Sequence, residues 1–397
     1  MKTFSDKIVQ ILNHGALNLA LGLGYAHKIF DVMDEMGTPV TLKALAEATL
    51  LDQRYLKEWL GIMVTGEIIT LITAPRKSND PKKEEQEETY YLPPAHADVL
   101  TRRARNNNLG VYTQETPLLT TCAMEAVQKG FLTGQGVSFD HYPRFQRFMS
   151  ELSNAKHEQV LIQTFLPSVD NGELVKRLNQ GIAVCDIGCG EGVALNLMAK
   201  AFPNSQFLGI DNHPGAISTA TESAEKTNLP NARFKLFDAA QIKGAETFYE
   251  KFDYVTAFDA IHDQSHPLTV LEGVRAMLKP GGQFSMVDIK AATHLQDNLD
   301  HPMGPFLYTV SLMHCMPVGL NDKGRGLGMM WGKEQALALL ALAGFDRVEA
   351  LEIPNDPFNL HFLCKNQTRM KLNSSKFSPC WKTQPYNQNN PSGNHIQ

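Results

Sequence analysis

The chain has 397 residues, of which 43% are hydrophobic and 20% are charged, and its formal net charge is −5. This length is enough for two domains with cores of their own, and the mildly acidic balance gives no general attraction to nucleic acid or to an anionic membrane. No apolar run approaches the roughly 20 residues that span a bilayer, and the first residues lack the apolar core of a signal peptide. We therefore expect a cytoplasmic protein without membrane or nucleic-acid partners.

Residues 1–100 are predicted to form a winged-helix domain. The apolar spacing and the turn residues predict helices over 5–36 (one long helix or two in series), 41–47 and 53–64, and strands over 67–72 and 89–92. Thr41 is placed to cap the second helix, and a charged loop that we expect to be mobile joins the two strands. Helix, turn, helix and a two-stranded wing follow one another as in a winged helix.

The charge of this domain argues against DNA binding. Residues 1–100 contain ten Lys and Arg against fourteen Asp and Glu, and the predicted recognition helix offers Arg54 and Lys57 beside Glu58. Phosphate-binding domains carry the opposite balance. We therefore expect a dimerisation and lid module.

Residues 101–180 are predicted to be a helical linker. Tyr142, Phe145 and Phe148 share one helix face, which predicts core packing. The alternative is that this helix covers a ligand pocket.

Strands and helices alternate regularly over residues 181–365. We expect strands near 182–186, 206–210, 233–237, 254–258, 283–288, 347–352 and 359–363, and helices over 193–202, 214–227, 267–278 and 333–342. This order predicts an α/β domain with a doubly wound, Rossmann-like parallel sheet, in which at least one of the last two strands is antiparallel. The tail over 366–397 is rich in Asn, Ser, Pro and Gln, and we expect it to be disordered.

A glycine-rich turn follows the first of these strands. Asp186 is followed by Gly188, Gly190 and Gly192, and Asp211 ends the second strand about 20 residues later, where a carboxylate meets ribose hydroxyls in such folds. Asp186 would repel a pyrophosphate but suits a cationic ligand. The alternative is a tight turn that binds no ligand.

Further polar residues end the neighbouring strands. Asn212 follows Asp211, Asp238 and Ala239 end the third strand, and Asp259 ends the fourth. Because ligands bind at the carboxyl ends of a doubly wound sheet, we expect these residues to line one site. Each Asp alone could instead be a helix cap.

The turn from Asp186 to Gly192 resembles motif I of the class I S-adenosylmethionine (SAM) methyltransferases, and Leu278-Lys279-Pro280-Gly281-Gly282 resembles the turn before their fifth strand. The resemblance implies SAM as cofactor, with Asp186 ordering contacts to its amino-acid end. It also implies cofactor contacts from a larger set of residues, namely Gly188, Gly190, Asp211, Asn212, Asp238, Ala239 and Asp259.

The pair His262-Asp263 resembles the His-Asp of the plant-type small-molecule O-methyltransferases. The resemblance implies that His262 is the general base, oriented by Asp263 or Asp259, and that the winged helix forms a homodimer. The glutamate that orients the base in those enzymes corresponds to Met330 here, so this partner is missing or supplied elsewhere. A structural, hydrogen-bonded histidine is the alternative for His262.

Most of the chain resembles a regulator-like group of such methyltransferases, from the winged helix through Trp331-Gly332 to Asn359. This resemblance implies a SAM-dependent methyltransferase with a small-molecule acceptor. The alternatives are a SAM-binding regulator without catalysis and a protein or nucleic-acid methyltransferase, for which there is neither a basic groove nor an Asn-Pro-Pro-Tyr motif.

An insert of about 45 residues between Asp288 and Lys333 is predicted to be a functional lid, because compact domains seldom carry loops this long. The spacing of its histidines and of Cys315 predicts no metal site. The six cysteines form no C-x-x-C motif and are expected to be reduced.

Overall fold

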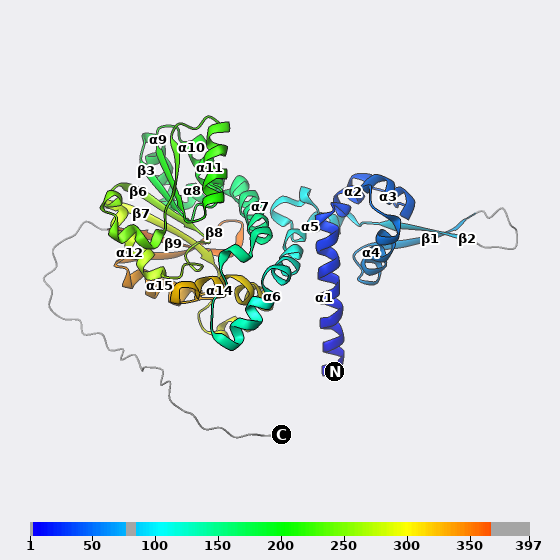
Figure 1. Ribbon diagram of the computed structural model, residues 1–397. Coiled ribbons are helices and arrows are strands. Elements are labelled where there is room, and N and C mark those ends of the chain that lie inside the picture. The colour runs from blue at the N-terminus through cyan, green and yellow to red at the C-terminus, as the bar shows by residue number, and fades with distance from the viewer. Residues whose placement is uncertain (1–2, 77–84, 367–397) are drawn as a thin grey trace, which may run out of the picture. The chain divides into compact units, whose positions relative to one another are not determined.

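The computed structural model describes residues 3–76 and 85–366, and Figure 1 shows its helices and strands. The tail from position 367 on and the middle of the charged wing loop lie outside these residues. Asn366 was placed in the tail by the sequence prediction, but it is buried and its amide donates to the carbonyls of Leu278 and Lys279 at 3.0 and 3.1 Å. Within the described part of the chain, no helix has the length and apolar character needed to cross a membrane.

The N-terminal elements follow the predicted winged-helix order. They are α1 (Phe4–Ala26), α2 (Ile29–Met36), α3 (Leu42–Thr49), α4 (Gln53–Thr65), β1 (Thr70–Arg76), β2 (Glu85–Tyr91) and α5 (Pro94–Leu100). The predicted helix over 5–36 is therefore two helices in series, separated where Lys28 adopts a left-handed backbone conformation. β1 begins and ends about three residues later than expected, and it pairs antiparallel with β2.

Local capping explains where these helices begin. The Thr41 hydroxyl accepts the Ala44 N–H at the start of α3, and the Asp52 carboxylate accepts the N–H groups of Arg54 and Tyr55 at the start of α4. Trp59 of α4 is buried, and its indole N–H donates to the Ala20 carbonyl at 2.8 Å. This bond satisfies the one polar atom of a large core side chain.

The segment between the wing and the sheet is mostly helical, as predicted. Its elements are η1 (Arg102–Asn107), η2 (Gly110–Gln114), α6 (Glu115–Thr133), η3 (Phe139–His141), α7 (Pro143–Val160), η4 (Leu161–Phe165), α8 (Leu166–Ser168), η5 (Val169–Gly172) and α9 (Glu173–Gln180). Tyr142, Phe145 and Phe148 are all buried, in one core with Val310 and Met313 of the insert. The aromatic stripe therefore packs in a core, and its partner is the predicted lid.

A seven-stranded sheet forms the centre of the C-terminal domain. Its strands are β3 (Ala183–Ile187), β4 (Gln206–Asp211), β5 (Ala232–Leu236), β6 (Phe252–Phe258), β7 (Leu278–Ile289), β8 (Arg347–Ile353) and β9 (Asp356–Lys365). Their order is β5-β4-β3-β6-β7-β9-β8, and β9 pairs antiparallel with both of its neighbours while the other pairs are parallel. The predicted α/β class, doubly wound order and antiparallel late strand are confirmed.

Helices cover both faces of this sheet. They are α10 (Val193–Ala201), α11 (Pro214–Lys226), α12 (Pro267–Met277) and α15 (Gly332–Leu342), with short η6 (Ala239–Gly244) and η7 (Glu246–Phe248) after β5. Two separate cores result: one contains Val270 of α12 and Leu339 of α15, and the other contains Leu195 of α10 and Leu178 of α9. The central strands β3, β6 and β7 are buried on both faces and are rich in apolar residues, which is why the sequence located them.

The insert between β7 and α15 contains η8 (Leu295–Asn298), α13 (Gly304–Val310), η9 (Ser311–Cys315), α14 (Met316–Gly319) and η10 (Asn321–Lys323). It contacts α6 and the start of α7, and the Tyr142 hydroxyl donates to the buried Met313 carbonyl at 2.7 Å. The insert is thus a folded helical segment whose position beside the ends of β6 and β7 is tied to the linker helices.

Candidate active site

The glycine turn connects β3 to α10 and lies against the end of β4. The N–H of Gly190 donates to Asp211 Oδ2 at 2.9 Å, and the N–H of His213 donates to Asp211 Oδ1 at 2.9 Å. Gly190 has a positive φ of 51°, and a Cβ built on it would meet no heavy atom within 4 Å. A ligand can therefore approach the backbone at Gly190, while Asp211 keeps carboxylate lone pairs for further donors.

The other two glycines of the turn are used for packing. A Cβ on Gly188 would lie 2.7 Å from the Ala260 side chain, and one on Gly192 would lie 2.5 Å from the Phe234 ring. The turn is therefore held closely against its neighbours on two sides and is open at Gly190.

Asp186 is buried one residue before the end of β3. Its Oδ1 accepts the Thr256 hydroxyl of β6 at 2.6 Å, and 2% of the residue is exposed. Burial raises the pKa of Asp186 to about 7, because a charged carboxylate loses its hydration there. A cationic group placed beside it would favour the charged form.

Asp238 and Ala239 follow β5. The Asp238 carboxylate caps η6 by accepting the Ala240 N–H at 2.9 Å, which is the structural role that we considered for such residues. Ala239 is buried, whereas Asn212, after β4, is exposed. Asp238 therefore caps a helix, and a single carboxylate oxygen, Oδ1, accepts the capping N–H.

Asp259 directly follows β6 and has a positive φ of 48°, a conformation that residues other than glycine seldom adopt. Its Oδ1 is buried and has no hydrogen-bond partner among the described residues. Burial raises the pKa of Asp259 to about 6. A buried carboxylate oxygen without a donor is costly, so this atom is poised to receive one from a ligand.

His262 lies in the loop after β6, and its ring is fixed by β7. Its Nδ1 is 2.7 Å from Asp288 Oδ1, and both side chains are buried. The same Oδ1 accepts the Trp331 indole N–H at 3.1 Å and the Ile289 N–H at 2.8 Å. The Trp331 and Ile289 N–H groups thus fix the position of this carboxylate oxygen. The oxygen in turn fixes the orientation of the His262 ring.

This geometry corrects our expectation about the orienting acid. The acid that orients His262 is Asp288, whose carboxylate binds the Nδ1 atom of the ring. Asp263 Oδ1 instead lies 3.5 Å from Nε2, on the other side of the ring. The acid that is absent at Met330 is therefore supplied by the end of β7. The available signal was Asp288 itself, which ends a predicted strand just as Asp186, Asp211 and Asp259 do.

The charges around the imidazole compete with its burial. Burial lowers the pKa of His262, but the negative charges of Asp288 and Asp263 outweigh it and hold the pKa well above the usual 6.5. The pair with Asp288 therefore stabilises an imidazolium, which is the state that a histidine reaches after it takes a proton.

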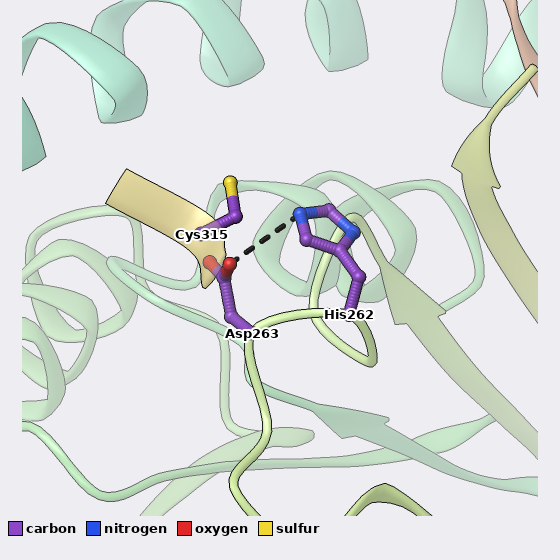
Figure 2. A group of neighbouring side chains, drawn as sticks. All are labelled: His262, Asp263 and Cys315. Atoms are coloured by element: carbon purple, nitrogen blue, oxygen red, sulfur yellow. Dashed lines mark ion pairs between the residues drawn. The ribbon is translucent and has the colours of Figure 1, made fainter. Parts of the chain in front are cut away.

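The insert adds Cys315 to this site. Figure 2 shows the Cys315 thiol beside the His262 ring and the Asp263 carboxylate, and one ligand atom from each lies within 4.8 Å of the others. Burial raises the pKa of the Cys315 thiol to about 12, with a further contribution from Asp263, so the thiol is neutral. The spacing of residues in the sequence did not predict that Cys315 lies beside His262 and Asp263. Cys315 belongs to a helical segment about 50 residues later in the chain.

Two family models match separate parts of the chain. Residues 15–102 match the family described as the Rv2258c-like winged HTH domain, and residues 178–316 match the family described as the methyltransferase domain. The second match includes the glycine turn, the strand-end acids, His262 and Cys315.

Parts of the chain are also similar to known methyltransferases. The chain is 33% identical over 104 residues to the ubiquinone biosynthesis O-methyltransferase of Actinobacillus pleuropneumoniae, which covers 26% of this chain and 43% of that protein. It is 28% identical over 178 residues to the trans-aconitate 2-methyltransferase of Variovorax paradoxus, which covers 44% of this chain and 63% of that protein. The chain thus matches less than two thirds of each relative's length.

Among solved structures, the fold resembles that of human N-acetylserotonin methyltransferase in complex with SAM, with a TM-score of 0.63 and 14% identity over 93% of this chain and 99% of that one. At this identity the likeness concerns the fold, and it extends over both domains. Residues 178–316 therefore match a methyltransferase domain, residues 15–102 match a winged HTH domain, and the fold over 93% of the chain resembles that of a methyltransferase.

Proposed function

We propose that the chain is a SAM-dependent methyltransferase that acts on a small-molecule acceptor. The observation that carries the proposal is the buried His262–Asp288 pair, which lies at the same edge of the sheet as the glycine turn and the strand-end acids. A fixed base beside a ligand-binding turn serves chemistry, whereas a regulator that only binds SAM needs no such pair.

The residues present fit SAM. Its ribose hydroxyls can donate to the Asp211 carboxylate, with Asn212 beside it, and its adenine can lie against Asp238 and Ala239, where a carboxylate accepts an amino group. Space is open at Gly190, and the buried Asp259 Oδ1 lacks a partner. Asp186 and Asp259 would face the positively charged amino-acid end, because opposite charges attract strongly at a buried site.

SAM supplies a methyl group on a positively charged sulfur, and this chain's residues would prepare the acceptor. His262 would take the acceptor's proton on Nε2, the nitrogen that does not face Asp288. Asp288 would stabilise the resulting imidazolium. The folded insert and the linker helices would close the site against water, and holding the reactants in line would provide much of the rate.

The N-terminal domain would serve assembly rather than nucleic-acid binding. Arg54 of α4 forms an exposed ion pair with Glu58, so a carboxylate accompanies this positive charge on the surface of the helix. Large apolar residues of α1 are exposed along one side of the helix: Phe4, Ile8, Ile11, Leu12, Leu19 and Leu23. We propose that this side pairs with a second copy of the chain, since such a patch is seldom left in water. A cytoplasmic location suits the five described cysteines, which are all free thiols.

Cofactor binding is the first test. We expect isothermal titration to show SAM and S-adenosylhomocysteine binding at micromolar concentrations, with a loss of at least tenfold in Asp211→Ala. The exposed Glu222→Ala on α11 is the control and should bind as the unaltered chain does. A folded chain that binds neither ligand would refute the proposal.

The base is tested on an acceptor found by screening metabolite extracts for S-adenosylhomocysteine formation. We expect His262→Ala to lower kcat by about 10²- to 10⁴-fold while SAM affinity is retained. Asp288→Asn should lower kcat and move the rising limb of the pH–rate profile to lower pH, because the charge that raises the pKa of His262 is gone. An unchanged profile with nearly normal kcat would exclude this role for Asp288.

Asp186→Asn should weaken SAM binding and yet stabilise the ligand-free chain at alkaline pH. The pKa of Asp186 is raised to about 7, so its contribution to stability is full below about pH 4 and is lost as the pH rises through 7. The substitution removes this loss, which is on the order of a few kcal/mol. Urea unfolding at pH 5 and pH 8 should show that the variant's advantage grows with pH, and equal advantages at both values would contradict this.

The dimer is tested by sedimentation. We expect Leu12→Glu, which places a charge within the apolar side of α1, to shift the chain from dimer to monomer. His14→Glu, on the other side of the same exposed part of the helix, should remain dimeric. A monomeric unaltered chain at micromolar concentration would contradict the proposal.

A further inference from the structure

Three side chains that offer metal ligands meet beside the end of β6. His262 and Asp263 are neighbours in the loop after this strand, and Cys315 comes from the helical segment 311–319 of the insert. One atom from each, an imidazole nitrogen, a carboxylate oxygen and the thiol sulfur, lies within 4.8 Å of the others (Figure 2). His262 and Cys315 are buried, whereas the Asp263 side chain is 23% exposed and forms the open side of the group.

The His262 ring is held in the way that a metal-binding histidine usually is. Nδ1 is 2.7 Å from Asp288 Oδ1, and that oxygen also binds Trp331 and the Ile289 N–H. A histidine that ligates a metal commonly donates its second N–H to a carboxylate, which sets the tautomer and the ring orientation. Nε2, the other ring nitrogen, faces Asp263, and it offers a lone pair to a metal once its proton has left.

The atoms that face one another are electron donors. Nε2 lies 3.5 Å from Asp263 Oδ1, and this oxygen is buried without a hydrogen-bond partner among the described residues. The Cys315 sulfur completes the group. In the metal-free chain the thiol proton and the imidazolium proton can lie among these atoms, and a cation that displaces both protons can bind all three ligand atoms.

We propose that His262 Nε2, Asp263 Oδ1 and Cys315 Sγ bind a divalent cation of the zinc class and leave its fourth coordination position open. A thiolate and an imidazole select Zn²⁺ over Mg²⁺ or Ca²⁺, and three protein ligands with one open position are typical of an accessible zinc site. On binding, the Cys315 thiol and the Nε2 atom of the His262 imidazolium each lose a proton to solvent, and the sulfur and the nitrogen bond to the metal.

The distances are compatible with tetrahedral coordination. Ligand atoms at ordinary Zn–N, Zn–O and Zn–S distances are about 3.3 to 3.6 Å apart. The Nε2–Oδ1 distance of 3.5 Å already falls in this range. The sulfur lies within 4.8 Å of the other two atoms. It would have to come closer by about 1.2 Å at most to reach the distance of about 3.6 Å.

A metal on Nε2 excludes a proton from the same lone pair. Occupancy of this site would therefore inhibit methyl transfer, a consequence that rests on the proposed role of His262 as base. Metal binding itself does not depend on that role, so the two are measured separately.

The experiment uses the untagged full chain after treatment with a chelator and its removal. Zn²⁺ is titrated calorimetrically, and Co²⁺ is added as a spectroscopic probe, because a cobalt–thiolate bond gives an intense near-ultraviolet charge-transfer band. We expect one Zn²⁺ per chain and a cobalt–thiolate band. Cys315→Ser and Asp263→Asn should each weaken Zn²⁺ binding by at least tenfold, and Cys315→Ser should abolish the band.

Cys364→Ser is the matched control, since Cys364 is also a buried thiol but lies in β9. It should bind Zn²⁺ and give the band as the unaltered chain does. Circular dichroism identifies variants that have failed to fold. The two ligand substitutions lie in different parts of the chain, so the test can be made with either variant if the other does not fold.

Equal Zn²⁺ affinity in the unaltered chain and in both ligand variants would overturn the proposal, as would absence of the thiolate band. The cluster would then be a hydrogen-bonded group, in which the thiol, 3.5 Å from His314 Nδ1, donates to that neighbour. Titration with SAM in parallel separates the two proposals: an unaltered chain that binds SAM but no Zn²⁺ refutes the metal site and leaves the methyltransferase proposal standing.

Discussion

The buried hydrogen bond between His262 and Asp288 connects the parts of the C-terminal domain on which the site depends. Asp288 ends β7, His262 lies in the loop after β6, and Trp331, which opens α15, donates to the same carboxylate oxygen. A carboxylate in a place with so little water is tolerated because three donors surround one of its oxygens. Loss of any one of these donors would leave the buried Asp288 carboxylate poorly paired. This cost holds β7, the loop after β6 and the start of α15 in one arrangement.

The same edge of the sheet carries polar atoms that the fold leaves unsatisfied. Asp259 Oδ1, Asp263 Oδ1 and Asp288 Oδ2 are buried without hydrogen-bond partners in the described part of the chain. Protein interiors seldom contain such atoms, because each costs free energy. Asp259 directly follows β6 and Asp288 lies near the end of β7, so a ligand that brings positive charge and donors to this edge of the sheet would satisfy these oxygens.

The insert and the linker helices act on the site as one packed unit. Tyr142, Phe145 and Phe148 pack against Val310 and Met313, and the Tyr142 hydroxyl holds the Met313 carbonyl. Cys315, two residues later, reaches His262 because of this packing. The apolar face that the sequence predicted to be a core or a cover is a core, and by forming it the linker sets the position of the insert.

The sequence by itself determined the elements and the local turn chemistry of this protein. The β-strands of the sheet, the turn from Asp186 to Gly192 and the acids at the strand ends could be predicted, because periodicity, glycine and capping preferences act between residues close in the chain. Only the tertiary structure decided that Asp288, rather than Asp259 or Asp263, orients His262, and that Cys315 joins the group. Those contacts depend on which strands are neighbours in the sheet and on how a long insert folds back, and both are set by packing between residues far apart in sequence.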